Sequence, residues 1–237
     1  MTAERATTRK EPEQMANTTT AAQVSRREQR RRQHHELSRS QLLDAAEEVF
    51  GRKGFYETTL KEVAELAEFS VGSVYSFFEN KDDLFRQIFV RRGNEFMELL
   101  REAVRADLGT PTEQLHRVTD LEVGYFRSHA RFGRLFLRYS SATMMAADRQ
   151  VDEAISANYD ESMRLQAGVF ERGQRAGELC DGDPQVLARL FSGIISAFQA
   201  LDPQVMSDAP AGEERFPLVE LHALVDRTFV TGRAATR

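Results

Sequence analysis

Apolar residues recur every three or four positions along most of this chain, and helix-capping signals separate the stretches in which they do so. The pattern is clearest in five residues that share one helical face: Leu42, Leu43, Ala46, Val49 and Phe50. No segment shows the strict alternation that is typical of a half-buried β-strand. The sequence therefore predicts an all-α fold with about nine helices.

Short polar motifs predict where the first helices begin. Ser38 with Gln41, and Thr59 with Glu62, have the spacing of a capping box, in which each side chain bonds to the other residue's backbone N–H. We therefore expect helices to begin at these two places. Further helices are expected over residues 71–78, 80–107, 110–128, 132–139, 151–175, 183–200 and 216–230, with a break at 140–147.

The first 36 residues are polar and rich in Thr and Arg, so we expect a disordered tail. Within it, residues 25–32 (SRREQRRR) hold five arginines and one glutamate. The formal net charge of −5 by itself argues against a nucleic-acid binder. However, residues 1–92 carry 16 Lys/Arg against 15 Asp/Glu, whereas residues 93–237 carry 16 against 22. A polyanion would therefore meet the N-terminal part, where the arginine cluster would add phosphate or minor-groove contacts.

The expected helices at 60–66 and 71–78 are joined by three residues, which is typical of a helix-turn-helix. Val74 and Phe78 lie four residues apart and would anchor the second of these helices to a core. Around it, Ser70, Gly72, Ser73, Tyr75, Ser76 and Phe77 are small or aromatic and carry no charge that would repel phosphate. A helix of this size fits the major groove of DNA, so we expect a nucleic-acid interface here.

The most specific motif is small-x-hydrophobe-Tyr-x-x-Phe-x-x-Lys, present as Ser73, Val74, Tyr75, Phe78 and Lys81. Other matching positions precede it: Ala45-Ala46, Phe50, Gly54, Phe55, Thr58-Thr59-Leu60 and Val63-Ala64. With these residues the stretch 40–89 resembles the DNA-binding domain of TetR-family transcriptional regulators. The turn departs from the family's Ala-Gly-apolar pattern, because it reads Ala67-Glu68-Phe69. We expect a strained or slightly altered turn at this place, since a non-glycine residue in a left-handed conformation costs about 1–2 kcal/mol.

The resemblance implies a division into a tail at 1–36, a helix-turn-helix DNA-binding domain at 37–83 and a larger helical ligand-binding and dimerisation domain at 84–237. It also implies a sequence-specific regulator, expected to act as a repressor, that binds a palindromic operator as a homodimer and is released by a small effector. The residues expected to contact DNA are Thr59, Lys61, Ser70, Val71, Gly72, Ser73, Tyr75, Ser76, Phe77 and Lys81.

The C-terminal part shows a helical pattern but no motif of its own. In the family, its last two long helices form the dimer and its middle helices enclose a ligand. The residues expected at the dimer interface are Leu187, Leu190, Phe191, Ile194, Phe198, Leu221, Leu224 and Val225. Those expected around an apolar or aromatic effector are Phe96, Met97, Leu100, Tyr125, Phe126, Phe136, Tyr139, Met144, Tyr159, Met163, Gln166 and Phe170. Ordinary core packing is the alternative for each of these residues.

Other classes of function lack support in the sequence. The chain has one cysteine, Cys180, and five histidines without ligand spacing, so we expect no metal site and no cofactor. It has no catalytic motif, no run long enough to span a membrane and no secretory signal, so we expect a cytoplasmic protein that is not an enzyme. Two alternatives remain open: a regulator that activates or answers to a protein partner, and an all-helical enzyme or binding protein that does not bind DNA.

Overall fold

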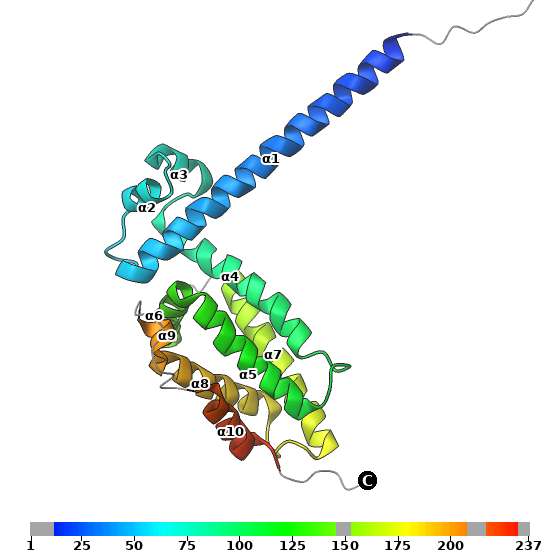
Figure 1. Ribbon diagram of the computed structural model, residues 1–237, viewed down its shortest axis with the longest axis vertical. Helices are drawn as coiled ribbons and strands as arrows, with labels where there is room; N and C mark the ends of the chain where they lie inside the picture. Colours follow the sequence, from blue (N-terminus) through cyan, green and yellow to red (C-terminus); the bar gives the residue numbers. More distant parts are fainter. Residues whose placement is uncertain (1–11, 146–152, 208–216, 232–237) are drawn as a thin grey trace, which may run out of the picture.

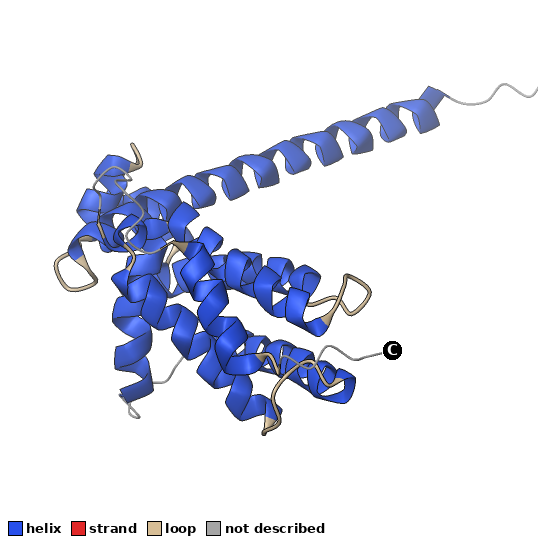
Figure 2. Cartoon of the chain, turned by 60° about the horizontal axis from the view of Figure 1, so that its bottom comes forward, coloured by secondary structure: helices blue, strands red, loops and turns tan. Residues whose placement is uncertain are grey.

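The computed structural model describes residues 12–145, 153–207 and 217–231, and this part of the chain is built from ten α-helices without a β-strand (Figures 1 and 2). The all-α prediction is therefore confirmed. The helices are α1 (Pro12–Lys53), α2 (Leu60–Leu66), α3 (Val71–Phe77), α4 (Lys81–Ala103), α5 (Pro111–Ser128), α6 (Ala130–Met145), α7 (Glu153–Ala176), α8 (Pro184–Leu201), α9 (Pro203–Met206) and α10 (Leu218–Phe229).

Helix α1 is one uninterrupted rod of 42 residues, and its N-terminal half stands clear of the other helices (Figure 2). The prediction of a disordered tail is therefore wrong for residues 12–36, and residues 1–11 lie outside the described part. Ser38 with Gln41 does not begin a helix either. From residue 13 to residue 50 the chain has neither proline nor glycine, and it is rich in residues that favour helices. Extending a helix that is already formed needs no new nucleus, so the polar segment continues the helix of residues 37–53.

Most of the other helix starts agree with the sequence. Thr59 and Thr110 form capping boxes with Glu62 and Glu113, and Ser70 caps α3 by accepting a hydrogen bond from the backbone of Ser73. Short helix α9 was not expected, although a proline opens it.

Two expected helix ends are wrong. Helix α4 stops at Ala103 instead of residue 107. The backbone carbonyls of Ala103 and Val104 accept hydrogen bonds from the side chains of Arg117 and Arg172, which replace the bonds that a longer helix would supply. Helix α6 continues through residues 140–145, where a break was expected, because Ser, Thr and Met in this stretch do not interrupt a helix.

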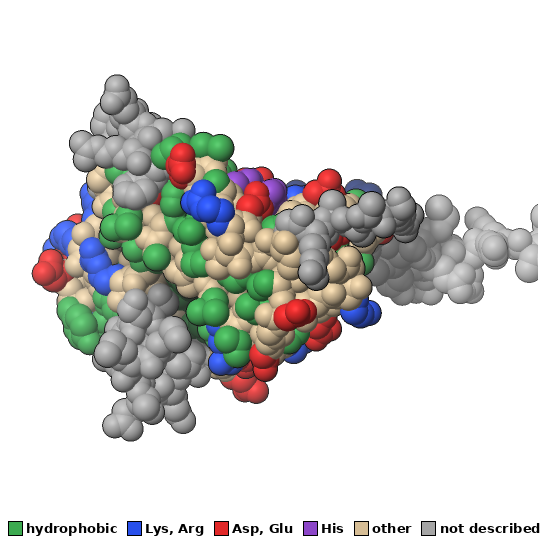
Figure 3. Space-filling model, turned by 90° about the horizontal axis from the view of Figure 1, so that it is seen from below, with side chains coloured by type: hydrophobic (Ala, Val, Ile, Leu, Met, Phe, Trp, Pro, Cys, Tyr) green, Lys and Arg blue, Asp and Glu red, His purple; other side chains and the backbone are tan. Residues whose placement is uncertain are grey.

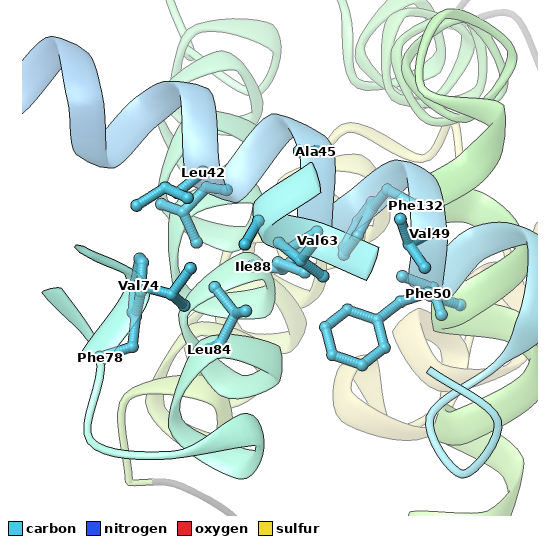
Figure 4. Packing of buried hydrophobic residues seen from close by; sticks show 14 of the residues in the cluster. Leu42, Ala45, Val49, Phe50, Val63, Val74, Phe78, Leu84, Ile88 and Phe132 are labelled. Carbon is cyan, nitrogen blue, oxygen red and sulfur yellow. The ribbon is translucent and has the colours of Figure 1, made fainter. Parts of the chain in front are cut away.

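The first apolar cluster joins the N-terminal helices to the rest of the protein (Figure 4). Val63 of α2 and Val74 of α3 pack with Phe50 of α1 and Ile88 of α4, and Phe132 of α6 belongs to the same cluster. All five side chains are buried. The packing thus crosses the domain boundary that was expected at residue 83, so α2 and α3 share one core with α4 and α6.

The second apolar cluster lies in the helical bundle formed by α4, α5, α7, α8 and α10 (Figure 1). Its centre contains Phe170, Phe191 and Phe229, whose ring centroids lie 5.3–6.1 Å apart. Phe96, in the middle of α4, packs against both clusters. Among the described helices, none is both long and apolar enough to cross a membrane.

Candidate functional site

Helix α2 places Thr59 and Lys61 at the protein surface. Thr59 accepts a hydrogen bond from the backbone of Glu62, and the Glu62 carboxylate accepts one from the backbone of Thr59 at 3.0 Å. Lys53 bonds to the same carboxylate, and together with Thr59 it lowers the pKa of Glu62 to about 2. Val63 and Ala64 hold the opposite face of α2 in the first apolar cluster. The start of α2 is therefore rigid and accessible.

The turn between α2 and α3 contains the expected strain. Glu68 has a φ of 60° and is the one non-glycine residue with a positive φ in the described part of the chain. The backbone N–H of Phe69 donates to the carbonyl of Ala64 at 2.8 Å, and the Phe69 ring packs against the first cluster. These contacts hold the turn although its left-handed residue carries a side chain. The prediction of a tolerated strain is confirmed.

Helix α3 has one anchored face and one open face. Val74 and Phe78 are 0% and 2% exposed, whereas Val71 and Tyr75 are 37% and 57% exposed. Ser70, Gly72 and Ser76 are also exposed, and Ser73 and Phe77 are half-buried. A Cβ atom at Gly72 would meet only the Ser70 hydroxyl, at 3.8 Å. The structure thus brings the predicted α3 residues together on an uncharged surface that a groove of DNA can approach closely.

Lys81 lies beside this surface, but its ammonium group binds the protein itself. Its Nζ donates to the carbonyls of Phe55 and Thr58, each at 3.0 Å, and lies 4.5 Å from the centre of the Phe55 ring. The side chain therefore fastens the loop between α1 and α2 to the start of α4. The ammonium group is therefore already bound to two carbonyl oxygens. The contact of Lys81 with a DNA phosphate stays a prediction.

The arginine cluster lies on the projecting part of α1, which continues outward from the contact of His35 with the C-terminal end of α3. Residues 26–37 are all exposed, and they include the five arginines of residues 26–32. The ring of His35 lies 4.6 Å from the ring of Phe77, which fixes the direction in which the basic segment leaves the domain. The helical conformation of this segment was not predicted from the sequence, although the lack of proline and glycine from residue 13 to residue 50 is typical of a helix.

The residues expected around an effector do not form one group. Tyr125, Phe126, Phe136 and Tyr139 belong to the first cluster or pack against it, whereas Met97, Leu100 and Phe170 belong to the second. Met163 and Gln166 are buried on α7. Tyr159 is 44% exposed, so its place in the interior is not supported. The Met144 side chain lies outside the described part.

Two of the expected tyrosines have structural partners. The Tyr139 hydroxyl accepts a hydrogen bond from the backbone of Phe55 at 2.8 Å, and the Tyr125 hydroxyl donates to the carbonyl of Arg92 at 3.0 Å. Tyr139 thereby links α6 to the loop before α2, and Tyr125 links α5 to α4. Of the two, only Tyr139 connects the bundle to the N-terminal helices, because the Tyr125 bond joins two helices of the bundle.

Sequence reasoning also missed one buried carboxylate. Glu122 of α5 is 8% exposed, and burial raises its pKa to about 8. Its one side-chain hydrogen bond comes from the Gln166 amide, at 3.3 Å. The usable signal was its position on the apolar face of α5, four residues from both Val118 and Phe126. No group of three His, Cys, Asp or Glu side chains that would hold a metal occurs among the described residues.

Exposed apolar side chains of α8 and α10, which we call the exposed stripe, lie at the end of the molecule opposite the projecting part of α1 (Figure 1), where Figure 3 shows several separate apolar areas. Its most exposed members are Val186, Leu190, Leu201, Val219 and Leu224, at 41–69%. Of the expected interface residues, Leu190 and Leu224 belong to this stripe, and Leu187, Ile194 and Phe198 are half-buried beside it.

Three other expected interface residues lie in the core. Phe191, Leu221 and Val225 are at most 2% exposed and form part of the second cluster, so their assignment to an interface is wrong. The physical reason is that α8 and α10 are apolar on more than one face, and one of these faces packs against the protein's own bundle.

Comparison with known proteins agrees with this geometry. The sequence profile described as "Bacterial regulatory proteins, tetR family" matches residues 42–88. An uncharacterized HTH-type transcriptional regulator, YhgD of Bacillus subtilis (strain 168), is 26% identical over 187 residues, which cover 77% of this chain and 93% of that protein. Regulators of this family are not enzymes.

Solved structures share the fold over most of its length. The transcriptional regulator FadR from Bacillus subtilis, in complex with stearoyl-CoA, has a TM-score of 0.62 and 21% sequence identity, covering 78% of this chain and 94% of that one. A protein from Saccharomonospora viridis in complex with choline has a TM-score of 0.67 and 15% identity, covering 82% and 98%. These likenesses establish the fold.

Proposed function

Since this chain is a member of the TetR family of transcriptional regulators by its DNA-binding domain at residues 42–88, we propose that it is a dimeric, effector-controlled repressor. It binds a palindromic operator through α3 of each protomer and is released by a small molecule held in the C-terminal bundle. The observation that carries this proposal is the open, uncharged face of α3, which Val74 and Phe78 hold outward from the first cluster.

DNA recognition combines a few base contacts with many backbone contacts. Helix α3 has no Arg, Asn or Gln, the residues that read bases by bidentate hydrogen bonds. Val71 and Phe77 suit contacts with thymine methyl groups, and the Ser73 hydroxyl can bond to a base edge. Thr59, Lys61 and Tyr75 are placed for phosphates, which position the protein without reading sequence. Specificity then depends in part on the shape of the DNA.

The exposed stripe of α8 and α10 supports a dimer. Large apolar side chains that face outward from two neighbouring helices are typical of a protein–protein interface. We propose that a two-fold axis through this stripe makes a four-helix contact, so that the dimer carries two copies of α3. Their spacing must match one turn of DNA, about 34 Å, or a multiple of it, and this requirement makes the operator palindromic.

Control by an effector follows from the way α4 connects the two clusters. The N-terminal half of α4 packs with α2 and α3, while Met97 and Leu100 pack in the second cluster. An effector that prefers one tilt of α4 changes the distance between the two α3 helices. A shift from 1:99 to 99:1 needs about 5.5 kcal/mol of differential affinity. Two proteins of this fold were solved in complex with stearoyl-CoA and with choline, and these complexes support control by a bound small molecule.

Fluorescence anisotropy with DNA from the region upstream of the protein's own gene tests the proposal. Wild-type protein should bind at nanomolar to micromolar concentrations, and Tyr75→Ala should weaken binding by about tenfold or more, which corresponds to roughly 1–3 kcal/mol. Tyr159→Ala, at an exposed tyrosine of α7, is the matched control and should bind as the wild type does. Equal affinity of all three proteins would contradict the role of α3.

A reporter gene under the same upstream region separates repression from the alternative, activation. Deleting the regulator should raise expression if it represses, and lower expression if it activates. If the wild-type protein binds no DNA from this region, the second alternative, a helical protein that has kept the fold without the DNA function, is favoured. DNA binding places the protein with the chromosome in the cytoplasm.

A further inference from the structure

The projecting part of α1 continues a face of this helix that the core of the DNA-binding domain defines. Leu42 and Ala46 are fully buried, and Leu42 belongs to the same apolar cluster as Val74 of α3 (Figure 4). At about 100° per residue, His35 lies within about 20° of both Leu42 and Ala46 around the axis of α1. We call this side of α1 the inner face. Because α1 is one uninterrupted helix, the inner face continues outward past α3.

Helix α3 lies against the inner face. The ring of His35 lies 4.6 Å from that of Phe77, and the guanidinium carbon of Arg39 lies 5.4 Å from the centre of the Phe78 ring. Both aromatic residues stand at the C-terminal end of α3. The first turn of α1 beyond His35 therefore lies next to this end of α3.

The open side of α3 points away from α1. Gly72 and Ser76 are exposed, and they lie about 160° from the buried Val74 around the axis of α3. Helix α1, helix α3 and the DNA of the proposed function therefore follow one another in that order. The major groove is about 8.5 Å deep, and a helix with its side chains is about 10 Å wide. A groove that receives α3 thus brings the strands at its edges level with the inner face of α1.

The arginines of the projecting part divide between two sides of the helix. Arg31 and Arg32 lie about 40° and 60° from His35, one turn further from the domain, so they stand on the inner face. Arg26 and Arg30 lie about 140–180° from His35, on the outer face. On that outer face, Nε of Arg30 donates to the backbone carbonyl of Arg26 at 3.4 Å. All four arginines are exposed.

Glu28 limits how far the basic part of the inner face extends. It lies about 20° from His35 and one turn beyond Arg31 and Arg32. Arg27 stands at the side of the helix, about 80° from His35. Because a carboxylate repels phosphate, the surface suited to DNA is the turn that carries Arg31 and Arg32.

We infer that Arg31 and Arg32 bind phosphates at the edge of the groove that α3 enters, whereas Arg26 and Arg30 point away from the duplex. This inference rests on the proposed function, because it assigns further residues to the same DNA interface. It also decides between the phosphate and minor-groove contacts that the sequence left open. The minor groove is about 6 Å wide, which is too narrow for a helix of about 10 Å, so the inner face meets the DNA backbone. Guanidinium groups bind phosphate oxygens through paired hydrogen bonds.

Two double variants that remove the same charge test the inference. The inner variant combines Arg31→Ala with Arg32→Ala, and the outer variant, its matched control, combines Arg26→Ala with Arg30→Ala. A dimer carries four inner arginines, so the slope of log operator affinity against log salt concentration should become shallower by about 3.6 in the inner variant, at about 0.9 for each phosphate. The outer variant should keep the wild-type slope. Alanine favours helices, so neither variant should unfold the segment.

Ethylation interference on the operator locates the phosphates themselves. Ethylation of the phosphates that the inner arginines bind should weaken binding by the wild type but not by the inner variant. Equal slopes for the two double variants, or the same interference pattern in the wild type and the inner variant, would overturn the inference.

Tyr75→Ala separates these outcomes from a failure of the proposed function. If the wild type binds the operator and Tyr75→Ala does not, the proposed function stands whichever slopes the double variants give. A wild-type protein that binds no operator contradicts the proposed function itself.

Discussion

The imidazole ring of His35 lies 4.6 Å from the ring of Phe77, so the projecting part of α1 contacts the C-terminal end of the helix that we assign to the DNA groove. This contact places a row of arginines at a fixed position relative to α3. The arginines of a flexible tail would lose conformational entropy on binding DNA phosphates. A helix that continues from the domain is already ordered and does not lose this entropy.

Removing the basic segment should therefore weaken DNA binding and its salt dependence together. A protein that lacks residues 1–32 should show a shallower slope of log affinity against log salt concentration, by about 0.9 for each phosphate that the segment neutralises. Anisotropy titrations at several salt concentrations measure this slope. Arg175→Ala, at an exposed arginine at the end of α7, should leave the slope unchanged. If the truncated protein keeps the wild-type slope, the arginines do not contact DNA.

The dimer interface can be tested at one exposed residue. Leu190→Glu places a charge in the centre of the α8 stripe, where the wild-type side chain is 56% exposed in the protomer. Sedimentation should then show monomers, and operator affinity should fall by about a hundredfold, because two half-sites are no longer bound together. Leu99→Glu, at a leucine of α4 that is 48% exposed, is the matched control. A Leu190→Glu protein that sediments as a dimer would place the interface elsewhere.

Relieving the strained turn should stabilise the protein. Glu68→Gly removes the penalty of a side chain at φ 60°, so the free energy of unfolding should rise by about 0.5–1 kcal/mol after the entropy cost of glycine. Glu65→Gly, inside α2, should lower it by about 1 kcal/mol. Chemical denaturation measures both changes. A decrease in the stability of Glu68→Gly would show that the glutamate side chain makes a favourable contact.

Lys81 should contribute to stability as well as to DNA binding. Lys81→Met removes the hydrogen bonds to the carbonyls of Phe55 and Thr58, so unfolding free energy should fall by roughly 1–3 kcal/mol. Lys61→Met, at a lysine whose side chain is 76% exposed, should change stability by less than about 0.5 kcal/mol. Thermal unfolding of the two variants distinguishes a positioning residue from a simple phosphate contact. Equal stability of both variants would contradict the role of Lys81 in the loop.

Burial of Glu122 should make stability depend on pH. Its pKa in the folded state is about 8, above the ordinary value of 4.5, so the folded protein holds the proton more tightly than the unfolded chain. The contribution of protonated Glu122 to the free energy of unfolding is therefore fully present below about pH 4.5. This contribution is lost as the pH rises through 8, where the buried carboxyl ionises. Each pKa unit between the folded and the unfolded state corresponds to about 1.4 kcal/mol of unfolding free energy. Between pH 6 and pH 9, the unfolding free energy of Glu122→Gln should therefore rise by a few kcal/mol relative to that of the wild type.

Denaturation of both proteins at these two pH values measures that gain. The exposed-site variant Glu171→Gln should follow the wild type at both values. A difference between Glu122→Gln and wild type that stays constant with pH would show that the carboxylate does not titrate in this range.

Local chemistry explains what the sequence predicted well. The capping residues Thr59, Ser70 and Thr110 act on backbone groups within three residues, so their roles can be read without knowledge of the fold. The motif from Ser73 to Lys81 was equally informative, because the anchor residues Val74 and Phe78 need only the helical period to share one face.

Features that depend on packing between distant segments were not predictable in this way. Leu190 and Phe191 are adjacent and equally apolar, yet one faces outward and the other lies in the second cluster. Glu122 looked like any other charged residue until α7 and α8 enclosed it. The helical state of residues 12–36 was missed because the segment is polar, and an apolar face was the criterion used to recognise a helix.

A DNase footprint on the upstream region tests the central claim most directly. We predict one protected region whose sequence is two-fold symmetric, with half-site centres about 10 base pairs or a multiple of that apart, and loss of this protection in Tyr75→Ala at the same protein concentration. Protection of a single unsymmetric site, or an unchanged footprint in Tyr75→Ala, would contradict the assignment of α3 as the DNA-reading helix of a dimer.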